Sequence, residues 1–228
     1  MSKFNIAKLS MAASIAVLSI GAQADVLTQW SFNNNNLLAT TGAGTASLVG
    51  GTTGSFASGA GSSDTNGRAW NTTSYAAQGT GDKTRGVQFS ISTLGFEDIS
   101  FSYDSKHSGT ASANELVQYS IDGLSFTDLV VFKSVDINFA NGRLVDLSSI
   151  AAVNNQANLS IRIVSTFAPN SSLYAGTTSN YAPGGTMRFD QVTFNGTAVS
   201  AVPEPTTYAM LLAGLGCVGF IARRRKAA

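Results

Sequence analysis

Apolar and polar residues alternate along much of the chain, with the period of two that is typical of β-strands with one face on a core. In residues 98–104, for example, Ile99 and Phe101 alternate with serine and aspartate. The strands expected from this alternation and from neighbouring apolar runs span residues 26–32, 86–91, 98–104, 115–121, 124–132, 143–147, 159–166 and 186–195.

Glycine, serine, threonine and asparagine separate these segments, and helical periodicity is almost absent. The sequence therefore predicts an all-β protein, an antiparallel β-sandwich in which alternate residues of each strand face the core. Asp122-Gly123 predicts a tight hairpin between two of the strands, because a type I′ turn requires positive φ. Residues 146–157 contain the one expected helical turn.

The last expected strand changes its parity. Met187 and Phe189 share one face of an ideal strand, whereas Val192 and Phe194 share the other. A β-bulge near residues 190–191 would bring all four side chains to the same face.

Residues 40–67 depart from the alternation. They hold eight glycines and few large apolar side chains. We interpret this stretch as a flexible surface loop with a short strand at residues 45–49.

The chain begins with two lysines and a short apolar run. Ala22-Gln23-Ala24 then supplies the small-x-small pattern that signal peptidase cleaves. Because the run is too short to span a bilayer, we expect residues 1–24 to be a signal peptide for the Sec translocon. Residues 25–200 would form the exported domain. An N-terminal core helix is the alternative.

Charge and cysteine content exclude several classes of protein. Six of the 14 basic residues lie in the terminal segments, which leaves eight against twelve acidic residues between them, a net charge of −4. Nucleic-acid binding needs clustered cations and is excluded. The single cysteine, Cys217, lies in the C-terminal apolar run, so the body has no disulfide, cysteine metal site or cysteine nucleophile.

The C-terminus has three successive parts. Pro203-Glu204-Pro205 is expected to be stiff and extended, because each proline fixes its own φ and restricts the residue before it. Residues 208–222 are uncharged and predict a short transmembrane helix. A basic run follows, which the positive-inside bias places in the cytoplasm: Arg223, Arg224, Arg225 and Lys226.

This tail closely resembles the PEP-CTERM sorting signal of Gram-negative bacteria, which exosortases read. The resemblance covers residues 202–226, within a sorting tail at 201–228, and implies that Pro203, Glu204 and Pro205 are the recognition tripeptide. The arginines would be the cytoplasmic stop. It also implies a transient stay in the inner membrane, processing by exosortase, and delivery to the cell surface or extracellular matrix, with an association with exopolysaccharide and biofilm.

A second resemblance concerns the body. The runs VQYSIDGLSFTDL, VDLSSI, NLSIRIVSTFA and GTMRFDQVTFNG look like the jelly-roll domains of secreted bacterial proteins, over residues 89–196. Those domains are similar to galactose-binding-like and carbohydrate-binding jelly rolls. The resemblance implies a fold and no activity.

Candidate catalytic groups are sparse. His107 is the only histidine; it could act as a general base, but the polar sequence around it favours a solvated loop residue. Glycoside hydrolysis needs paired carboxylates, and Glu97, Asp98 and Glu115 are the first to consider. Glu97 and Asp98 would point to opposite faces of one strand, so we expect no catalytic residue and a protein that is not an enzyme.

Four aspartates are possible Ca²⁺ ligands, although no EF-hand spacing supports them and turn or strand-end positions are the preferred interpretation. We therefore expect no metal and no other cofactor. The four are Asp104, Asp122, Asp128 and Asp190.

Four aromatic residues lie in polar, glycine-rich stretches and are candidates for stacking on sugars. Loop aromatics that fold back and seal the ends of the sandwich are the favoured alternative. The four residues are Trp70, Tyr75, Tyr174 and Tyr181.

Three functional hypotheses follow. The first is a noncatalytic surface or matrix protein, sorted by exosortase, that binds or organises exopolysaccharide. The second is a secreted hydrolase of a glycan or ester. The third is a structural protein that keeps its tail as a single-pass membrane anchor.

Overall fold

The computed structural model describes residues 24–64, 67–199 and 205–225. The expected signal peptide, apart from Ala24, and both Pro203 and Glu204 lie outside these residues, so the signal peptide and the domain boundaries stay predictions. The described elements are β1 (Ala24–Trp30), β2 (Thr41–Gly42), β3 (Gly44–Val49), β4 (Thr53–Ser58), β5 (Arg68–Thr73), β6 (Gly86–Ile91), β7 (Phe96–His107), β8 (Asn114–Ser120), β9 (Thr127–Lys133), β10 (Phe139–Asp146), the 3₁₀ turn η1 (Ala151–Val153), β11 (Leu159–Ser165), β12 (Met187–Ala198) and α1 (Pro205–Arg225).

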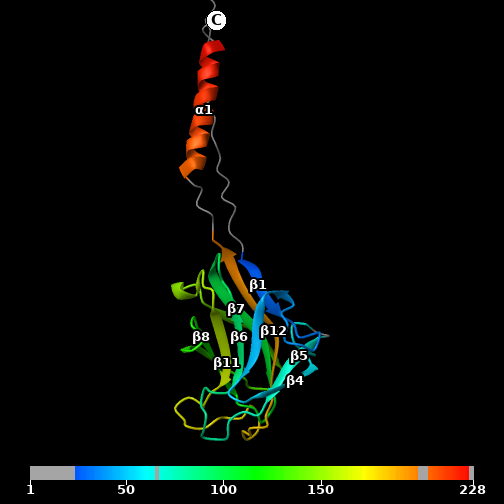
Figure 1. Cartoon of the computed structure of the whole chain (residues 1–228). Helices are drawn as coiled ribbons and strands as arrows, with labels where there is room; N and C mark the ends of the chain where they lie inside the picture. The colour runs from blue at the N-terminus through cyan, green and yellow to red at the C-terminus, as the bar shows by residue number, and fades with distance from the viewer. Residues whose placement is uncertain (1–23, 65–66, 200–204, 226–228) are drawn as a thin grey trace, which may run out of the picture.

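The strands form two antiparallel sheets that pack face to face (Figure 1). The five-stranded sheet has the order β3-β6-β11-β8-β9. The seven-stranded sheet runs β10-β7-β12-β1-β2, and β5 joins it by pairing with β12 and with β4. The expected antiparallel β-sandwich is therefore confirmed.

The core lies between the sheets and is rich in aromatic rings. Trp30 and Phe89 lie with ring centroids 5.2 Å apart, and Phe101 and Phe194 with centroids 4.8 Å apart. Burying one such side chain contributes about 1.5–3 kcal/mol. The alternating apolar positions of β6, β7 and β12 all face this core, so the period of two in the sequence corresponds to one buried face.

The bulge expected in the last strand is confirmed. The pairing of β12 with β7 shifts register between Asp190 and Thr193, and Gln191 adopts a φ of 47°. As a result Phe189 and Val192 are both fully buried despite their opposite parity. The expected helical turn in residues 146–157 is present as η1.

Two expectations for local structure are wrong. Residues 40–67, expected to be mostly flexible loop, contain β2 and β4 as well as the expected β3. Backbone hydrogen bonds to neighbouring strands order β2 and β4. Their side chains therefore give little indication of strand structure in the sequence. The hairpin between β8 and β9 exists, but Asp122-Gly123 does not form a two-residue turn, since residues 121–126 all lie between the strands.

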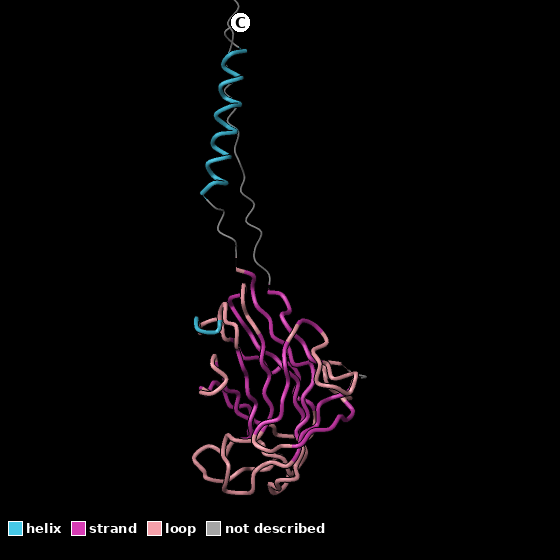
Figure 2. The backbone as a smooth tube through the Cα atoms, in the orientation of Figure 1, coloured by secondary structure: helices cyan, strands magenta, loops and turns pink. Residues whose placement is uncertain are grey.

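Both described ends of the sandwich chain lie at one end of the molecule. Ala24 in β1 pairs with Thr197 in β12, so the chain enters and leaves the sandwich side by side (Figure 1). Long loops gather at the opposite end, where Figure 2 shows them in pink.

α1 confirms that the tail is helical over the expected residues 208–222, but the expectation that this helix spans a membrane is not borne out. It begins at Pro205, a position where proline loses no helical hydrogen bond, and its last turn holds three arginines. Their positive charge suits the negative C-terminal end of the helix dipole. Across the part of the chain that the structure describes, no helix combines the length and the hydropathy needed to cross a membrane.

Candidate functional site

The outer face of the five-stranded sheet carries two rows of polar side chains. In β6, Val87 and Phe89 face the core, so Gln88 and Ser90 face outward. The antiparallel register aligns outward residues of four strands into a first row, Thr45, Ser90, Ser160 and Ser120. A second row is formed by Ser47, Gln88, Arg162 and Gln118.

Hydrogen bonds join the side chains within and between these rows. The hydroxyls of Ser90 and Ser160 lie 2.7 Å apart, and the Gln88 amide donates to Ser90 over 3.1 Å. Arg162 Nε donates to Gln88 Oε1 over 2.8 Å. The guanidinium of Arg162 lies 3.6 Å from the ring centroid of Phe126, which holds it in a cation–π contact.

Three residues of the first row, Thr45, Ser90 and Ser160, line an open groove of about 520 Å³ together with the adjoining loops. Gln88, Ser90 and Ser160 form its floor, while Asn158 and the segment Asp122-Gly123 also line it. Gly123 has a φ of 72°, a left-handed conformation that a residue with a side chain would adopt only with strain. We name this feature the polar groove.

Asp122 is the acidic residue among those that line the polar groove. It accepts hydrogen bonds from the backbone N–H groups of Ser125 and Leu124 and from the Ser120 hydroxyl. These bonds lower the pKa of Asp122 well below its ordinary value. The carboxylate therefore organises the loop and stays ionised at neutral pH.

Hydroxyl and amide groups both donate and accept hydrogen bonds, so the polar groove suits a neutral ligand with many hydroxyls. Sequence reasoning missed these residues because it followed the apolar positions. The signal was present in the same strands, at the outward-facing positions, where serine and glutamine predominate over charged residues.

The four aromatic candidates do not lie in the polar groove. Trp70, Tyr75 and Tyr174 have exposed fractions of 1%, 3% and 3%, so these three rings are not exposed for stacking on a sugar. Trp70 lies in β5, where it packs edge-on against Phe89 in the core.

The two loop tyrosines pack together beneath the long loops. Tyr174 and Tyr181 stack with centroids 4.5 Å apart. The Tyr174 hydroxyl donates to the carbonyl of Gly81 over 2.8 Å, and the Tyr181 hydroxyl donates to that of Ala76 over 2.6 Å. Burial raises the pKa of Tyr181 to about 12. The positions of Tyr174 and Tyr181 agree with the favoured alternative, in which loop aromatics fold back and seal one end of the sandwich.

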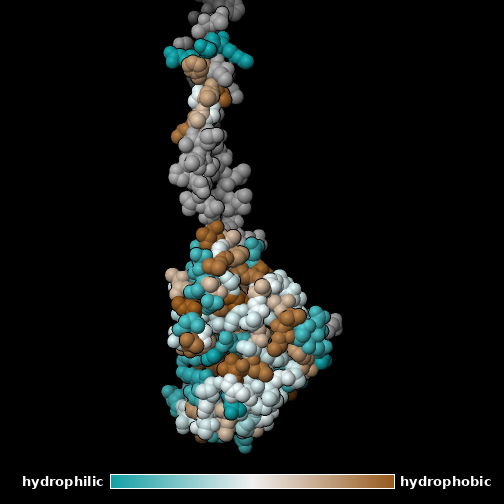
Figure 3. All heavy atoms as spheres, viewed as in Figure 1, coloured by the Kyte–Doolittle hydropathy of each residue, from teal (hydrophilic) through white to brown (hydrophobic). Residues whose placement is uncertain are grey.

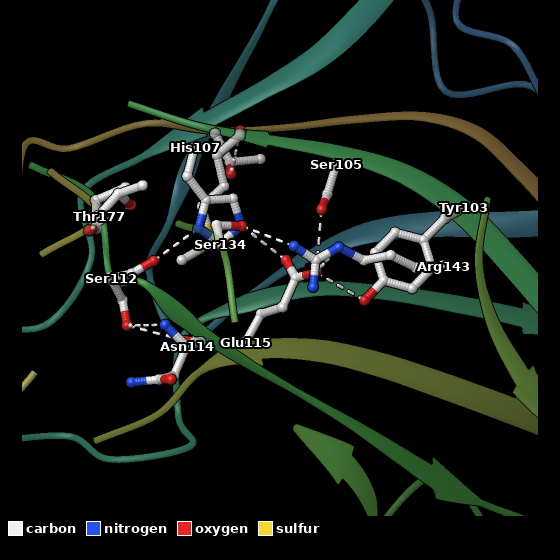
Figure 4. Close-up of polar contacts among 12 residues, drawn as sticks. Tyr103, Ser105, His107, Ser112, Asn114, Glu115, Ser134, Arg143 and Thr177 are labelled. Atoms are coloured by element: carbon white, nitrogen blue, oxygen red, sulfur yellow. Dashed lines mark hydrogen bonds and ion pairs between the residues drawn. The ribbon is translucent and has the colours of Figure 1, made fainter. Parts of the chain in front are cut away.

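His107 is not a solvated loop residue. It ends β7, its side chain is fully buried, and it converges with Glu115 and Arg143 inside the sandwich (Figure 4). Its Nδ1 lies 2.7 Å from the carbonyl of Ser112 and its Nε2 lies 2.9 Å from Glu115 Oε2. Both ring nitrogens thus face acceptors, and neither is available to a substrate.

Glu115 is the centre of this buried network. Tyr103 donates a hydrogen bond to Oε1 over 2.9 Å, and Arg143 Nε forms an ion pair with the same oxygen at 3.1 Å. Burial alone would raise the pKa of Glu115, but its electrostatic interactions with His107 and Arg143, together with hydrogen bonds from His107 and Tyr103, outweigh burial and lower that pKa to about 2. The other carboxylates considered for hydrolysis, Glu97 and Asp98, lie near the start of β7, and they form no pair with Glu115.

The four possible Ca²⁺ ligands lie at three separate places in the sandwich. Asp104 and Asp190 pair on adjacent strands, whereas Asp128 forms an ion pair with Lys83 and Asp122 lies in the groove loop. Among the described residues, no three carboxylate, histidine or cysteine side chains gather closely enough to hold a metal ion.

Comparison with known proteins identifies the tail. Residues 201–226 match the PEP-CTERM protein-sorting motif, so the chain carries this motif, as expected. No curated protein shows a significant match to the sequence.

The body is similar to carbohydrate-binding β-sandwiches of known structure. One is the CBM22-1–GH10 part of xylanase 10B from Clostridium thermocellum, with a TM-score of 0.51, 12% identity, and coverage of 78% of this chain and 30% of that chain. Another is the CBM22-1 xylan-binding domain of Paenibacillus barcinonensis Xyn10C, with a TM-score of 0.44, 11% identity, and coverage of 79% and 99%. Our chain thus spans less than a third of the xylanase chain. At such identities the first likeness shows the fold alone.

Proposed function

We propose that this protein is exported, is processed at its tail by an exosortase, and acts at the cell surface as a noncatalytic glycan-binding protein. The sorting motif at residues 201–226 supports the first part. The polar groove supports the second part, because the neutral hydroxyl and amide side chains of Thr45, Gln88, Ser90, Asn158 and Ser160 line it and offer a ligand both donors and acceptors.

Binding rather than hydrolysis suits the chemistry of the groove. A glycosidase needs two carboxylates on either side of the scissile bond. Asp122 contributes one, and no second carboxylate is among the residues that line the groove. An exopolysaccharide of the matrix is the partner we propose, because its repeated hydroxyls match the hydroxyl and amide groups that line the polar groove.

The route to the surface uses three further partners. The Sec translocon and signal peptidase act at the N-terminus, and exosortase acts at the C-terminus. We propose that the basic end of the tail keeps the chain at the inner membrane until processing. The side-by-side position of Ala24 and Thr197 supports a route in which both processing events occur at the same end of the folded body.

The sorting step is tested by replacing Pro203, Glu204 and Pro205 with alanine. Mass spectrometry of the membrane fraction and of the medium should show the wild-type protein without its arginine end, and the variant intact and in the inner membrane. Equal release of both proteins would contradict exosortase processing.

Glycan binding is tested with Gln88→Ala combined with Asn158→Ala, two residues that line the polar groove. Loss of two hydrogen-bonding groups should weaken binding to purified exopolysaccharide about tenfold or more. Ser47→Ala is the matched control, since Ser47 is exposed on the same sheet but does not line the groove. Binding unchanged in the double variant, or hydrolysis of the glycan by the wild type, would contradict the proposal.

A further inference from the structure

Asp122 is the one charged residue among those that line the polar groove, and its side chain is exposed. Within residues 24–64, 67–199 and 205–225, the carboxylates that form ion pairs are those of Asp128 and Glu115. Arg162, the cation of the second row, is held by its cation–π contact and is not among the groups that shift the pKa of Asp122. The negative charge in the groove therefore has no counter-ion in the described part of the chain.

The groove loop uses one oxygen of this carboxylate. Asp122 Oδ1 accepts the backbone N–H groups of Leu124 and Ser125, each over 2.8 Å, and the hydroxyl of Ser120 over 2.7 Å. These three bonds fix the orientation of the carboxylate and leave Oδ2 free. The groups that lower the pKa of Asp122, the Ser125 N–H foremost, are all uncharged, so the bound loop keeps the group ionised without neutralising it.

Asp122 stands beside the hydroxyl groups of the groove. Ser90 and Ser160 lie opposite each other on β6 and β11, and Ser120 of β8 lies opposite Ser160 on its other side. Neighbouring strands are about 4.8 Å apart, so hydroxyls recur at this spacing across the sheet. Asp122 follows Ser120 by two positions and Asn158 precedes Ser160 by two, and both line the groove. One anion and one amide thus lie at the same end of the row.

A free, ionised carboxylate oxygen only accepts hydrogen bonds, and a cationic donor bonds it more strongly than a neutral hydroxyl does. The hydroxyl and amide groups of the groove serve the hydroxyls of a sugar, whereas Asp122 adds a point that favours positive charge. The body as a whole has eight basic residues against twelve acidic ones, so its field also attracts cations. An acidic sugar would meet like charge here.

We infer that the polar groove binds a saccharide that carries free amino groups, and that Oδ2 of Asp122 accepts a hydrogen bond from a sugar ammonium group. The volume of the groove, about 520 Å³, lies within the range of ligand sites. Asp122 is then the residue that sets the specificity of the groove among glycans. This inference rests on the proposed function and names the class of saccharide that the groove selects.

The test is a titration of the full-length protein, in nonionic detergent, with two oligosaccharides of equal length. One is the β-1,4-linked tetramer of glucosamine, with free amines, and the other is its fully N-acetylated counterpart. In mildly acidic buffer the amines are protonated and Asp122 stays ionised. The wild type should bind the amine form about threefold to fivefold more tightly, as one exposed ion pair allows. Added salt should reduce this preference.

Asp122→Asn should abolish the preference. Asparagine keeps an Oδ1 acceptor for the N–H groups of Leu124 and Ser125, so the variant should bind the acetylated tetramer as tightly as the wild type does. Asp136→Asn is the matched control. Asp136 also orders its own loop through Oδ1, which accepts the N–H of Asn138, but it does not line the groove. The control removes the same charge from the body and should keep the preference.

Three results would overturn the inference: equal affinity of the wild type for the two tetramers, a preference unchanged in Asp122→Asn, or an equal loss of preference in Asp136→Asn, which would indicate attraction by the net charge of the body. If Asp122→Asn fails to fold, the wild type still decides the question, because a preference that added salt does not reduce is not caused by charge.

The proposed function can fail separately. A wild-type protein that binds purified exopolysaccharide but neither tetramer would overturn the assignment of an amino sugar and leave glycan binding in place. A wild-type protein that does not bind exopolysaccharide would contradict the proposed function itself.

Discussion

Glu115 and Asp190 are both fully buried carboxylates on strands of the same sandwich, yet their surroundings act on them in opposite directions. Glu115 interacts with Arg143 and His107, and its pKa falls to about 2. Burial raises the pKa of Asp190 to about 6, and the nearby carboxylates of Asp104 and Asp64 add to the rise while the Ser62 hydroxyl and the Gln191 N–H only partly oppose it. The charge of the partners, rather than the depth of burial, decides which form of the acid is stable.

The two sites therefore contribute to stability in different ranges of pH. Glu115 stabilises the fold above its unfolded pKa of 4.5, and this contribution is lost as the pH falls toward 2. Ionised Asp190 destabilises the fold above pH 6, and this cost disappears as the pH falls to 3.8. Together they favour a stability maximum in mildly acidic solution, near pH 4–5, which denaturant unfolding across pH would measure.

The largest expected effect comes from Glu115→Gln. The variant leaves the buried Arg143 guanidinium without a counter-ion, which costs about 3–5 kcal/mol of unfolding free energy. Urea unfolding at pH 7 measures the loss. Asp128→Asn is the control, because its ion pair with Lys83 lies at the surface and should change stability by at most about 1 kcal/mol. Equal effects of the two variants would show that the buried network has no special role.

Asp190→Asn should have the opposite sign. The amide removes the buried charge while keeping the shape, so the variant should be more stable than the wild type at pH 7, by at most about 3 kcal/mol for a shift of about two pKa units. The gain should vanish below pH 3.8, where the wild-type carboxyl is neutral in both states. A gain that persists at pH 3 would mean that packing, not charge, is responsible.

The smallest expected effect comes from Ser62→Ala, which removes a 2.7 Å hydrogen bond to Asp190 Oδ2. Because this bond favours the ionised carboxylate, the variant should lose about 1–2 kcal/mol at pH 7 and less at pH 4. Ser63→Ala is the control, since Ser63 bonds Asp104 through its backbone and should change stability by less than about 0.5 kcal/mol. If the loss of stability is the same at pH 7 and at pH 4, the contribution of the Ser62 hydroxyl does not depend on the ionisation of Asp190.

Much of the fold could be predicted from the pattern of apolar residues. The strand at residues 86–91 was expected with the bounds that β6 has, and the change of parity between Phe189 and Val192 correctly indicated a bulge. β4 and β5 could not be predicted in this way. Their order depends on hydrogen bonds to each other and to β12, and glycine and threonine carry little side-chain signal for such pairing.

The candidate sites were less predictable. Trp70 and His107 lie in polar sequence, and exposure is the ordinary expectation for such surroundings. Their burial follows from partners distant in the chain, such as Phe89 for Trp70. Likewise, Lys106 and Arg188 are 82 positions apart, and only the pairing of β7 with β12 makes them neighbours.

The sequence by itself determined the sandwich and the sorting tail, because alternation of apolar residues and the order of proline, apolar and basic segments are local properties of the chain. Only the tertiary structure decided where polar groups meet. The register between strands aligned the serines of the groove, enclosed Glu115 with His107 and Arg143, and left Lys106 opposite Arg188. Electrostatic energies depend on distances between side chains, and the packing of the sheets sets those distances.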